Sequence, residues 1–487
     1  MGGLSTAMIG DRARVLRDGR PVVLRTATEH YGAILNGAFD YVAYLDLLAG
    51  SGGNLTRTFV LFRELQSAVN PYSTCKPESI DYLAPYPRTD AGRDDPTALD
   101  GQPRFDLDRW DDRFFERLHD FVGRAATLGV TVELTLFSNT YAEAIWELNP
   151  LHHANNVNGL CPIHWTEHIT ARDPDRLERQ LALVDKIVAE CRDHPNVIFE
   201  PCNEPGAGAP VEPPVVAVTQ AEVNAWLDLL IARIRSTDDG RHLIAGQEAF
   251  RYQPWEQPLD RSMTAMDVDI VNVHPLPGTS LGGRTYELGR FMSGDLALAE
   301  VRDFCAAAAA GPKPVNLDED NTASQYTEHF GWTIHRKRAW VAALSGCHYD
   351  LIDFTIRPGL PLGSPAAGTD LRSWTRFLGA ACDRWGIAAA VPAEGPRLVD
   401  GSVVAVARSV GSIGNERVLL YLADAAEGTR RHPSIGPVSC TFEASADVRE
   451  IRAFRPADGS EVASLVPDDD GRFTVDFVED LLLELTS

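Results

Sequence analysis

Short apolar runs alternate with longer amphipathic segments up to about residue 385. The short runs are bounded by glycine, proline and polar residues, which is typical of buried β-strands. Runs predicted to be strands are 21–26, 54–62, 130–137, 196–200, 243–246, 268–273, 313–317 and 348–355. Between them, apolar residues recur at helical spacing, and the predicted helices are 38–49, 107–128, 173–191, 219–234, 296–310, 327–344 and 371–384.

Eight strands that alternate with helices predict an α/β fold, a (β/α)8 TIM barrel. A hairpin around Asp18-Gly19, within residues 13–28, leads into the first strand. We therefore expect a barrel domain with an N-terminal hairpin over residues 1–387.

The pattern changes after residue 388, where no helical period is evident. Short runs separated by turn residues predict strands at 403–408, 417–422, 448–454, 461–466, 473–477 and 481–485. This segment, 388–487, is expected to form a small all-β sandwich, an accessory domain that either binds glycan or braces the barrel. Bracing is favoured, because the segment has no obvious aromatic platform.

Two glutamates follow predicted strands, at the end of the barrel where chemistry gathers. Glu204 comes after the fourth strand, in Asn203-Glu204-Pro205, and Glu319 after the seventh. The ends of these strands face one another across a barrel mouth. Two carboxyl groups brought together in this way are a candidate pair for chemistry that needs one nucleophile and one general acid.

Asn-Glu-Pro after a strand resembles the acid/base motif of clan A glycoside hydrolases, which include the cellulase-like family 5. Residues 314–319 resemble the strand that presents the nucleophile there. The resemblance covers roughly residues 15–385. It implies that Glu204 is the general acid, that Glu319 is the nucleophile, and that the enzyme cleaves O-glycosidic, most commonly β, bonds with retention.

The same resemblance implies three further site residues. Arg57 matches the arginine that holds the nucleophile charged, and Asn203 matches the amide that binds the sugar 2-hydroxyl. His274 ends the sixth strand, as a histidine does in the clan. Family 5 often has a tyrosine two residues later, but Leu276 stands here. That contact to the nucleophile is either missing or supplied from elsewhere, such as by Tyr31 or Tyr349.

Other polar and aromatic residues follow the predicted strands or lie in long loops at the same end. His30, Tyr31 and Asn139 are candidates to hold sugar hydroxyls, with a structural role as the alternative. Trp165 is a candidate stacking platform, with packing inside its own loop as the alternative. Asp318 and Asp320 flank Glu319 and, by strand alternation, are expected to point away from its site.

Metal and cofactor sites are not expected. His152, His153, His164 and His168 lie in an irregular loop, and only His164 and His168 have helical i, i+4 spacing. A metal-dependent barrel hydrolase that uses these histidines stays open as an alternative. A barrel that binds carbohydrate without turnover, or a structural scaffold, is the other alternative.

The net charge of the chain restricts the kinds of molecule that it is expected to bind. The chain has 45 Lys and Arg against 69 Asp and Glu, a formal net charge of −24. Such acidity argues against nucleic acid and anionic membranes as partners and is compatible with an oligosaccharide, polysaccharide or glycoside. Eight scattered cysteines are expected to be free thiols. No secretory leader is evident, so we expect a cytoplasmic protein unless the chain was trimmed. The sequence indicates neither the sugar nor the oligomeric state.

Overall fold

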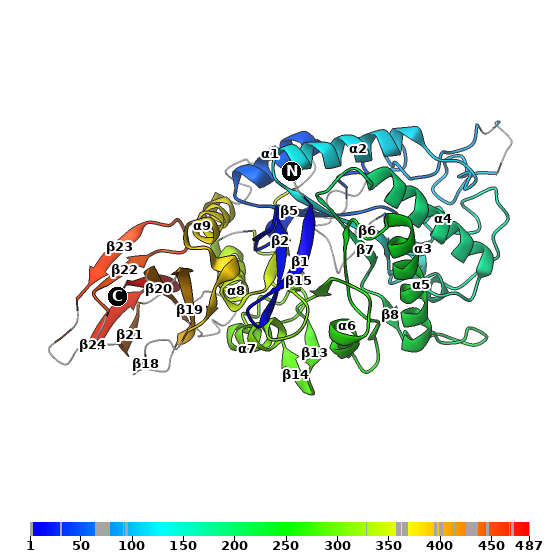
Figure 1. Cartoon of the computed structure of the whole chain (residues 1–487). Helices are drawn as coiled ribbons and strands as arrows, with labels where there is room; N and C mark the ends of the chain where they lie inside the picture. The colour runs from blue at the N-terminus through cyan, green and yellow to red at the C-terminus, as the bar shows by residue number, and fades with distance from the viewer. Residues whose placement is uncertain are drawn as a thin grey trace.

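The computed structural model describes residues 3–29, 32–63, 78–90, 92, 96–327, 329–356, 362, 369–393, 397–398, 403–412, 415–424, 437–444, 448–466, 468 and 472–486. A barrel occupies one part of the molecule, and a stack of antiparallel strands lies beside its last two helices, α8 and α9 (Figure 1).

Eight parallel strands form the barrel, in sequential order around it, and the predicted (β/α)8 fold is confirmed. Backbone hydrogen bonding between Asn54 and Arg25, with N···O 3.0 Å, brings the first two strands together. The strands are β4 (Arg25–Thr28), β5 (Leu55–Phe59), β6 (Thr131–Ser138), β7 (Val197–Asn203), β9 (Leu243–Gly246), β12 (Ile270–Val273), β15 (Val315–Asp320) and β16 (His348–Ile352).

Helices follow each barrel strand. The predicted capping box of α5 is present, with Thr219 accepting from the Glu222 amide. The helices are α1 (Tyr41–Gly50), α2 (Asp112–Thr127), α3 (Glu143–Trp146), α4 (Pro174–Cys191), α5 (Gln220–Asp238), α6 (Asp260–Thr264), α7 (Leu298–Ala309), α8 (His329–Ser345) and α9 (Thr369–Trp385), with 3₁₀ turns η1 (Trp165–Glu167) and η2 (Ile387–Ala389). Among the helices described, none is long and apolar enough to cross a membrane.

The N-terminal hairpin closes the bottom of the barrel. Its strands are β1 (Leu4–Ile9), β2 (Arg12–Arg17) and β3 (Arg20–Pro21), and the predicted turn at Asp18-Gly19 has positive φ at both residues. Leu4 and Val15 pack on residues from the lower parts of the barrel strands, such as Leu55. The open end is therefore the one at which the strands finish. β1 was not predicted, because most of its residues are partly or fully exposed and do not alternate.

Short strands in the loops above the barrel form two small sheets. One pairs β8 (Gly206–Ala207) with β10 (Phe250–Arg251), directly after the segment that carries Glu204. The other contains β11 (Gln257–Pro258), β13 (Pro277–Leu281) and β14 (Arg284–Glu287).

The C-terminal segment forms two antiparallel sheets with an apolar core of their own, as predicted. All six predicted strands are present, whereas β21 was missed because its residues are mostly half-exposed. The six-stranded sheet contains β17 (Val391–Pro392), β19 (Val403–Ser412), β20 (Asn415–Asp424), β25 (Asp480–Thr486), β22 (Glu450–Phe454) and β23 (Glu461–Leu465), and the second contains β18 (Arg397–Leu398), β21 (Val438–Glu443) and β24 (Arg472–Phe477). The domain boundary at 387–388 stays a prediction.

Helix α8 joins the sandwich to the barrel. Trp340 stacks on Tyr421 with ring centroids 5.8 Å apart, and Arg336 donates to Asp480 in a pair that is almost completely buried. Burial would lower the pKa of Arg336, but Asp480 raises it above its usual value. The large apolar core of the barrel also includes residues of β19, β20, β22 and β25.

We expect Asp480→Ala to destabilise the protein by about 3–5 kcal/mol, because it removes a carboxylate from a buried arginine. Denaturant unfolding of the full chain measures this loss. The control is Glu461→Gln, which removes an exposed pair with Arg452 in the same sandwich and should change the midpoint little. Equal midpoints for the two variants would show that the buried pair does not hold the interface together.

Candidate active site

Glu204 stands just past β7, at the open end of the barrel. Its φ of +43° is in the left-handed region that non-glycine residues rarely adopt. The next turn is tightly packed: a Cβ on Gly206 would lie 2.6 Å from Cζ of Phe250 and 2.7 Å from Cε2 of Tyr252. Only glycine fits there, so close packing behind Glu204 fixes the turn that carries it.

Glu319 lies inside β15, where the strand is irregular. The register against β16 shifts between Leu317 and Asp320, and Glu319 has a φ of +52°. The irregularity breaks the alternation of side chains, so Asp318 and Glu319 both face the site. The prediction that Asp318 points away is therefore wrong. Asp320 does lie elsewhere, where it accepts from Arg338 at 2.6 Å.

Arg57 lies at the centre of the barrel interior and is fully buried. Its Nη1 donates to Oε2 of Glu319 at 2.6 Å, and its Nη2 donates to Oε2 of Glu200 at 2.6 Å and to Oδ1 of Asn203 at 2.8 Å. Its Nε lies 3.2 Å from Oδ2 of Asp318. Burial would lower the pKa of Arg57, but the surrounding carboxylates raise it well above its usual value. A permanent cation therefore contacts Glu319.

His274, just past β12, connects the two candidate carboxylates. Its Nδ1 lies 2.7 Å from Oε1 of Glu204, and its Nε2 lies 3.8 Å from Oε2 of Glu319 and 3.5 Å from Oδ2 of Asp318. A single imidazole ring thus spans the gap between Glu204 and Glu319.

Burial would lower the pKa of His274, but Glu319, Glu204 and Asp318 together raise it well above its usual value. The surrounding carboxyl groups therefore favour the protonated form of the ring. Because the pKa is raised on folding, the ring's charge stabilises the fold most below the unfolded pKa, and this contribution is lost as the pH rises through the folded value.

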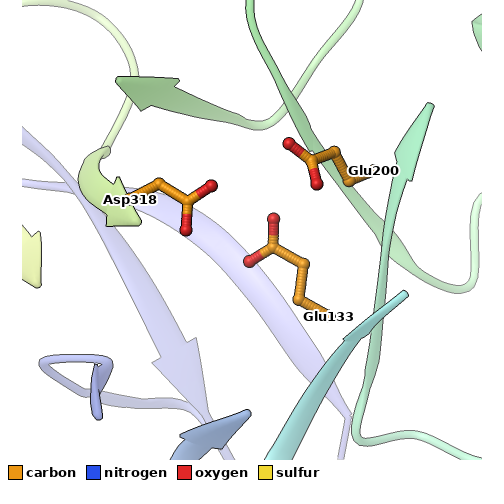
Figure 2. Close-up of side chains that lie close together, drawn as sticks. All are labelled: Glu133, Glu200 and Asp318. Atoms are coloured by element: carbon orange, nitrogen blue, oxygen red, sulfur yellow. The ribbon is translucent and has the colours of Figure 1, made fainter. Parts of the chain in front are cut away.

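A cluster of three buried carboxyl groups lies beneath this pair. Side chains of Glu133, Glu200 and Asp318 point toward one another (Figure 2), and one oxygen from each lies within 4.8 Å of the others. Asn272 donates to Glu133 at 2.6 Å and to Glu200 at 3.1 Å. Burial, followed by the charges of Asp318 and Glu200, raises the pKa of Glu133 well above its usual value. This environment favours the protonated form of Glu133, which would limit the negative charge inside the barrel.

Within the described part of the chain, this cluster is the group of side chains close enough to share a metal ion. All its ligands would be carboxylate oxygens, which suit calcium or magnesium. However, the guanidinium of Arg57 already contacts Glu200 and Asp318, and a divalent cation bound to the same carboxylates would be repelled by it. The donor set fits a buried arginine better than a metal.

Asn203 and Tyr141 complete a path between the two candidate carboxylates. Asn203 accepts from Arg57, and its Nδ2 donates to the hydroxyl of Tyr141 at 2.9 Å. The Tyr141 hydroxyl in turn donates to Oε2 of Glu204 at 2.6 Å. Tyr141 was not selected from the sequence. The available signal was its place three residues after the end of β6.

Four predicted substrate contacts remain. His30 and Tyr31 lie outside the described residues. Asn139 follows β6, and its side chain donates to the hydroxyl of Tyr252. Trp165 begins η1 and is half-buried against the core and the ring of His164, 5.5 Å away between centroids.

Tyr349 and His168, which were considered for other roles from the sequence, have different partners in the structure. Tyr349 donates to Asp320 at 2.8 Å, so it is not the missing contact to Glu319. His168 lies with Nδ1 2.6 Å from the carbonyl oxygen of Trp165 and Nε2 2.9 Å from that of Ser138, so both of its nitrogens already have backbone partners.

Part of the chain matches the model of a known protein family. Residues 94–332, which contain both Glu204 and Glu319, match the model of the cellulase family, glycosyl hydrolase family 5. A candidate glycoside hydrolase from Bacteroides vulgatus superposes with a TM-score of 0.56 at 14% identity, over 100% of this chain and 82% of that one. A family 5 glycoside hydrolase from the same organism gives 0.54 at 14%, over 100% and 94%.

At such identities the structural matches establish the fold, and no curated protein matches the chain. The family match and the barrel together support the expected resemblance. The chain contains a cellulase-like, glycosyl hydrolase family 5 domain over residues 94–332, within a barrel of the clan A type that is followed by a β-sandwich.

Proposed function

We propose that this protein is a retaining glycosidase that cleaves β-linked O-glycosides by double displacement, with Glu319 as nucleophile and Glu204 as general acid and base. One observation carries the proposal: the two carboxylates end nonadjacent barrel strands, and the single imidazole of His274 spans the gap between them. Two carboxyl groups at one open end of a barrel suit double displacement, in which one attacks the anomeric carbon while the other protonates the departing oxygen.

In the first step Glu319 attacks the anomeric carbon while Glu204 protonates the departing oxygen. Arg57 supports this role because its guanidinium donates to Glu319 and favours the ionised carboxylate. In the second step Glu204, now ionised, takes a proton from water, which displaces Glu319 and releases the sugar with its original configuration.

Substrate recognition is proposed for the residues around the pair. Asn203 lies beside Glu204 and suits the sugar 2-hydroxyl, although its amide hydrogens bind Tyr141 and Ser138 in this structure. His274 would hold sugar oxygens between the carboxylates. His30, Tyr31, Asn139 and Trp165 remain proposed contacts to the substrate.

Glu204→Ala tests the proposal through the leaving group. Aryl glycosides with good leaving groups need little protonation, so their first step should remain fast. Substrates with poor leaving groups should slow by about 10²–10⁴-fold. Pre-steady-state release of the aryl group, measured across a panel of aryl β-glycosides, gives both rates.

Equal loss for all leaving groups would contradict the role of Glu204. Wild-type turnover that disappears with a chelator and returns with added metal would instead favour a metal-dependent hydrolase. Binding of a glycan without any turnover would favour a non-catalytic barrel.

A further inference from the structure

Both carboxylate oxygens of Glu204 are held by side chains from other strands. His274 contacts Oε1 at 2.7 Å, and the Tyr141 hydroxyl donates to Oε2 at 2.6 Å. The same hydroxyl accepts from Asn203, which accepts from Arg57, which donates to Glu319. One continuous series of hydrogen bonds therefore runs from one carboxylate to the other.

We propose that Tyr141 is a positioning residue, whose hydroxyl orients the Glu204 carboxyl and adjusts the pH at which it gives up its proton. This inference rests on the proposed function, because it assigns Tyr141 a task in the general-acid step. A carboxyl group that has a hydrogen bond at only one oxygen can still rotate about its Cγ–Cδ bond. A second contact at the other oxygen fixes the plane of the group, and with it the direction in which its proton points.

The backbone and the packing of Tyr141 support a fixed position. Its φ is +61°, a conformation that surrounding contacts must maintain in a tyrosine. Its ring packs edge-on against Phe62, with centroids 6.4 Å apart. The residue as a whole is 36% exposed, but its hydroxyl is desolvated beside Glu204 and Glu319, and this desolvation, followed by the two charges, raises the pKa of Tyr141 well above its usual value. The hydroxyl therefore keeps its proton over the working pH range and stays a donor.

Because the Tyr141 hydroxyl is a hydrogen-bond donor, the direction of its effect on Glu204 can be stated. A hydroxyl that donates to a carboxylate stabilises the ionised form, so removing it lets Glu204 hold its proton to higher pH. The alkaline limb of kcat/KM, which reports loss of the proton from the general acid in the free enzyme, should then move upward. A hydrogen bond to a charged group corresponds to a shift of about one pH unit.

The test is Tyr141→Phe in the full chain, which removes one oxygen and keeps the ring. We expect the alkaline limb to move up by about one pH unit and kcat for poor leaving groups to fall about tenfold. Substrates with good leaving groups should be nearly unaffected.

Tyr41→Phe is the matched control, because its hydroxyl also donates to a carboxylate, Asp120, on α1 and α2 outside the barrel interior. That variant should leave the limb and the rates unchanged. A lower melting temperature of Tyr141→Phe with an unshifted limb would overturn the inference and leave Tyr141 a structural residue.

A titration without substrate separates this inference from the proposed function. The ¹³C carboxyl resonance of Glu204, assigned with Glu204→Gln, should titrate at higher pH in Tyr141→Phe than in the wild type. If no glycoside is turned over by the wild type, the proposed function fails, whereas this titration still decides whether Tyr141 controls the proton of Glu204. An unchanged titration overturns the inference.

Discussion

Glu319→Ala should abolish glycoside hydrolysis, with a loss on the order of 10⁴-fold or more, as for removal of other enzymic nucleophiles. The reason is geometric. Glu319 lies beside a buried cation, and among the described residues its neighbour Asp318 is held against Arg57, Glu133 and Glu200, so Asp318 is not expected to take its place. Added azide should partly restore turnover by entering the vacated space, and the glycosyl azide it forms should have the inverted configuration.

Glu204→Ala supplies the matched comparison for that experiment. There Glu319 still forms the covalent intermediate, so azide attacks from the acid/base side and yields the retained anomer. Glycosyl azides of the same configuration from both variants would contradict the division of roles between Glu204 and Glu319.

Arg57→Lys should lose about 10²–10³-fold in kcat/KM while the fold survives. Lysine keeps a positive charge but cannot donate to Glu319, Glu200 and Asn203 at once, as the guanidinium does. With the cation displaced, Glu319 ionises only at higher pH, so the acidic limb of the pH–rate profile should move upward.

Arg57→Met should have the larger structural effect. It would leave Glu200, Asp318 and Glu319 without their shared cation, and breaking such a buried pair costs about 3–5 kcal/mol. The melting temperature and pH–rate profile of both variants separate the two roles. An unshifted acidic limb with normal kinetics in Arg57→Lys would remove Arg57 from the site.

The pattern of apolar residues was sufficient to predict the barrel, because strands that are buried on both faces appear in the sequence as continuous apolar runs. It also brought Glu204 and Glu319 to attention, since each lies within a few residues of the end of such a run. The sandwich strand β21 was missed because partly exposed strands with polar residues on one face give a weaker signal.

The directions of the side chains on β15 could not be predicted. Nothing in the sequence there signals that the strand is irregular, so regular alternation of side chains was assumed. The irregularity at Glu319 brings Asp318 against Arg57 and His274. Tyr141 was missed for a related reason: its contact with Glu204 depends on a left-handed backbone that no residue preference signals.

The buried charged residues of the barrel could have been recognised from the sequence but were not. Glu133 and Glu200 are each the charged residue of a fully buried strand, and a carboxyl group in such a strand must find partners. Their meeting with Asp318 required three strands to be placed in space, which spacing along the chain does not provide.

Product stereochemistry tests the central claim most directly. An aryl β-glycoside that the enzyme hydrolyses is followed by ¹H NMR from the first minutes, before the free sugar equilibrates between anomers. The account predicts that the β-anomer forms first, because Glu319 and then water each invert the anomeric carbon. The α-anomer as the first product would contradict it, since water would then have attacked directly and Glu319 would not be the nucleophile.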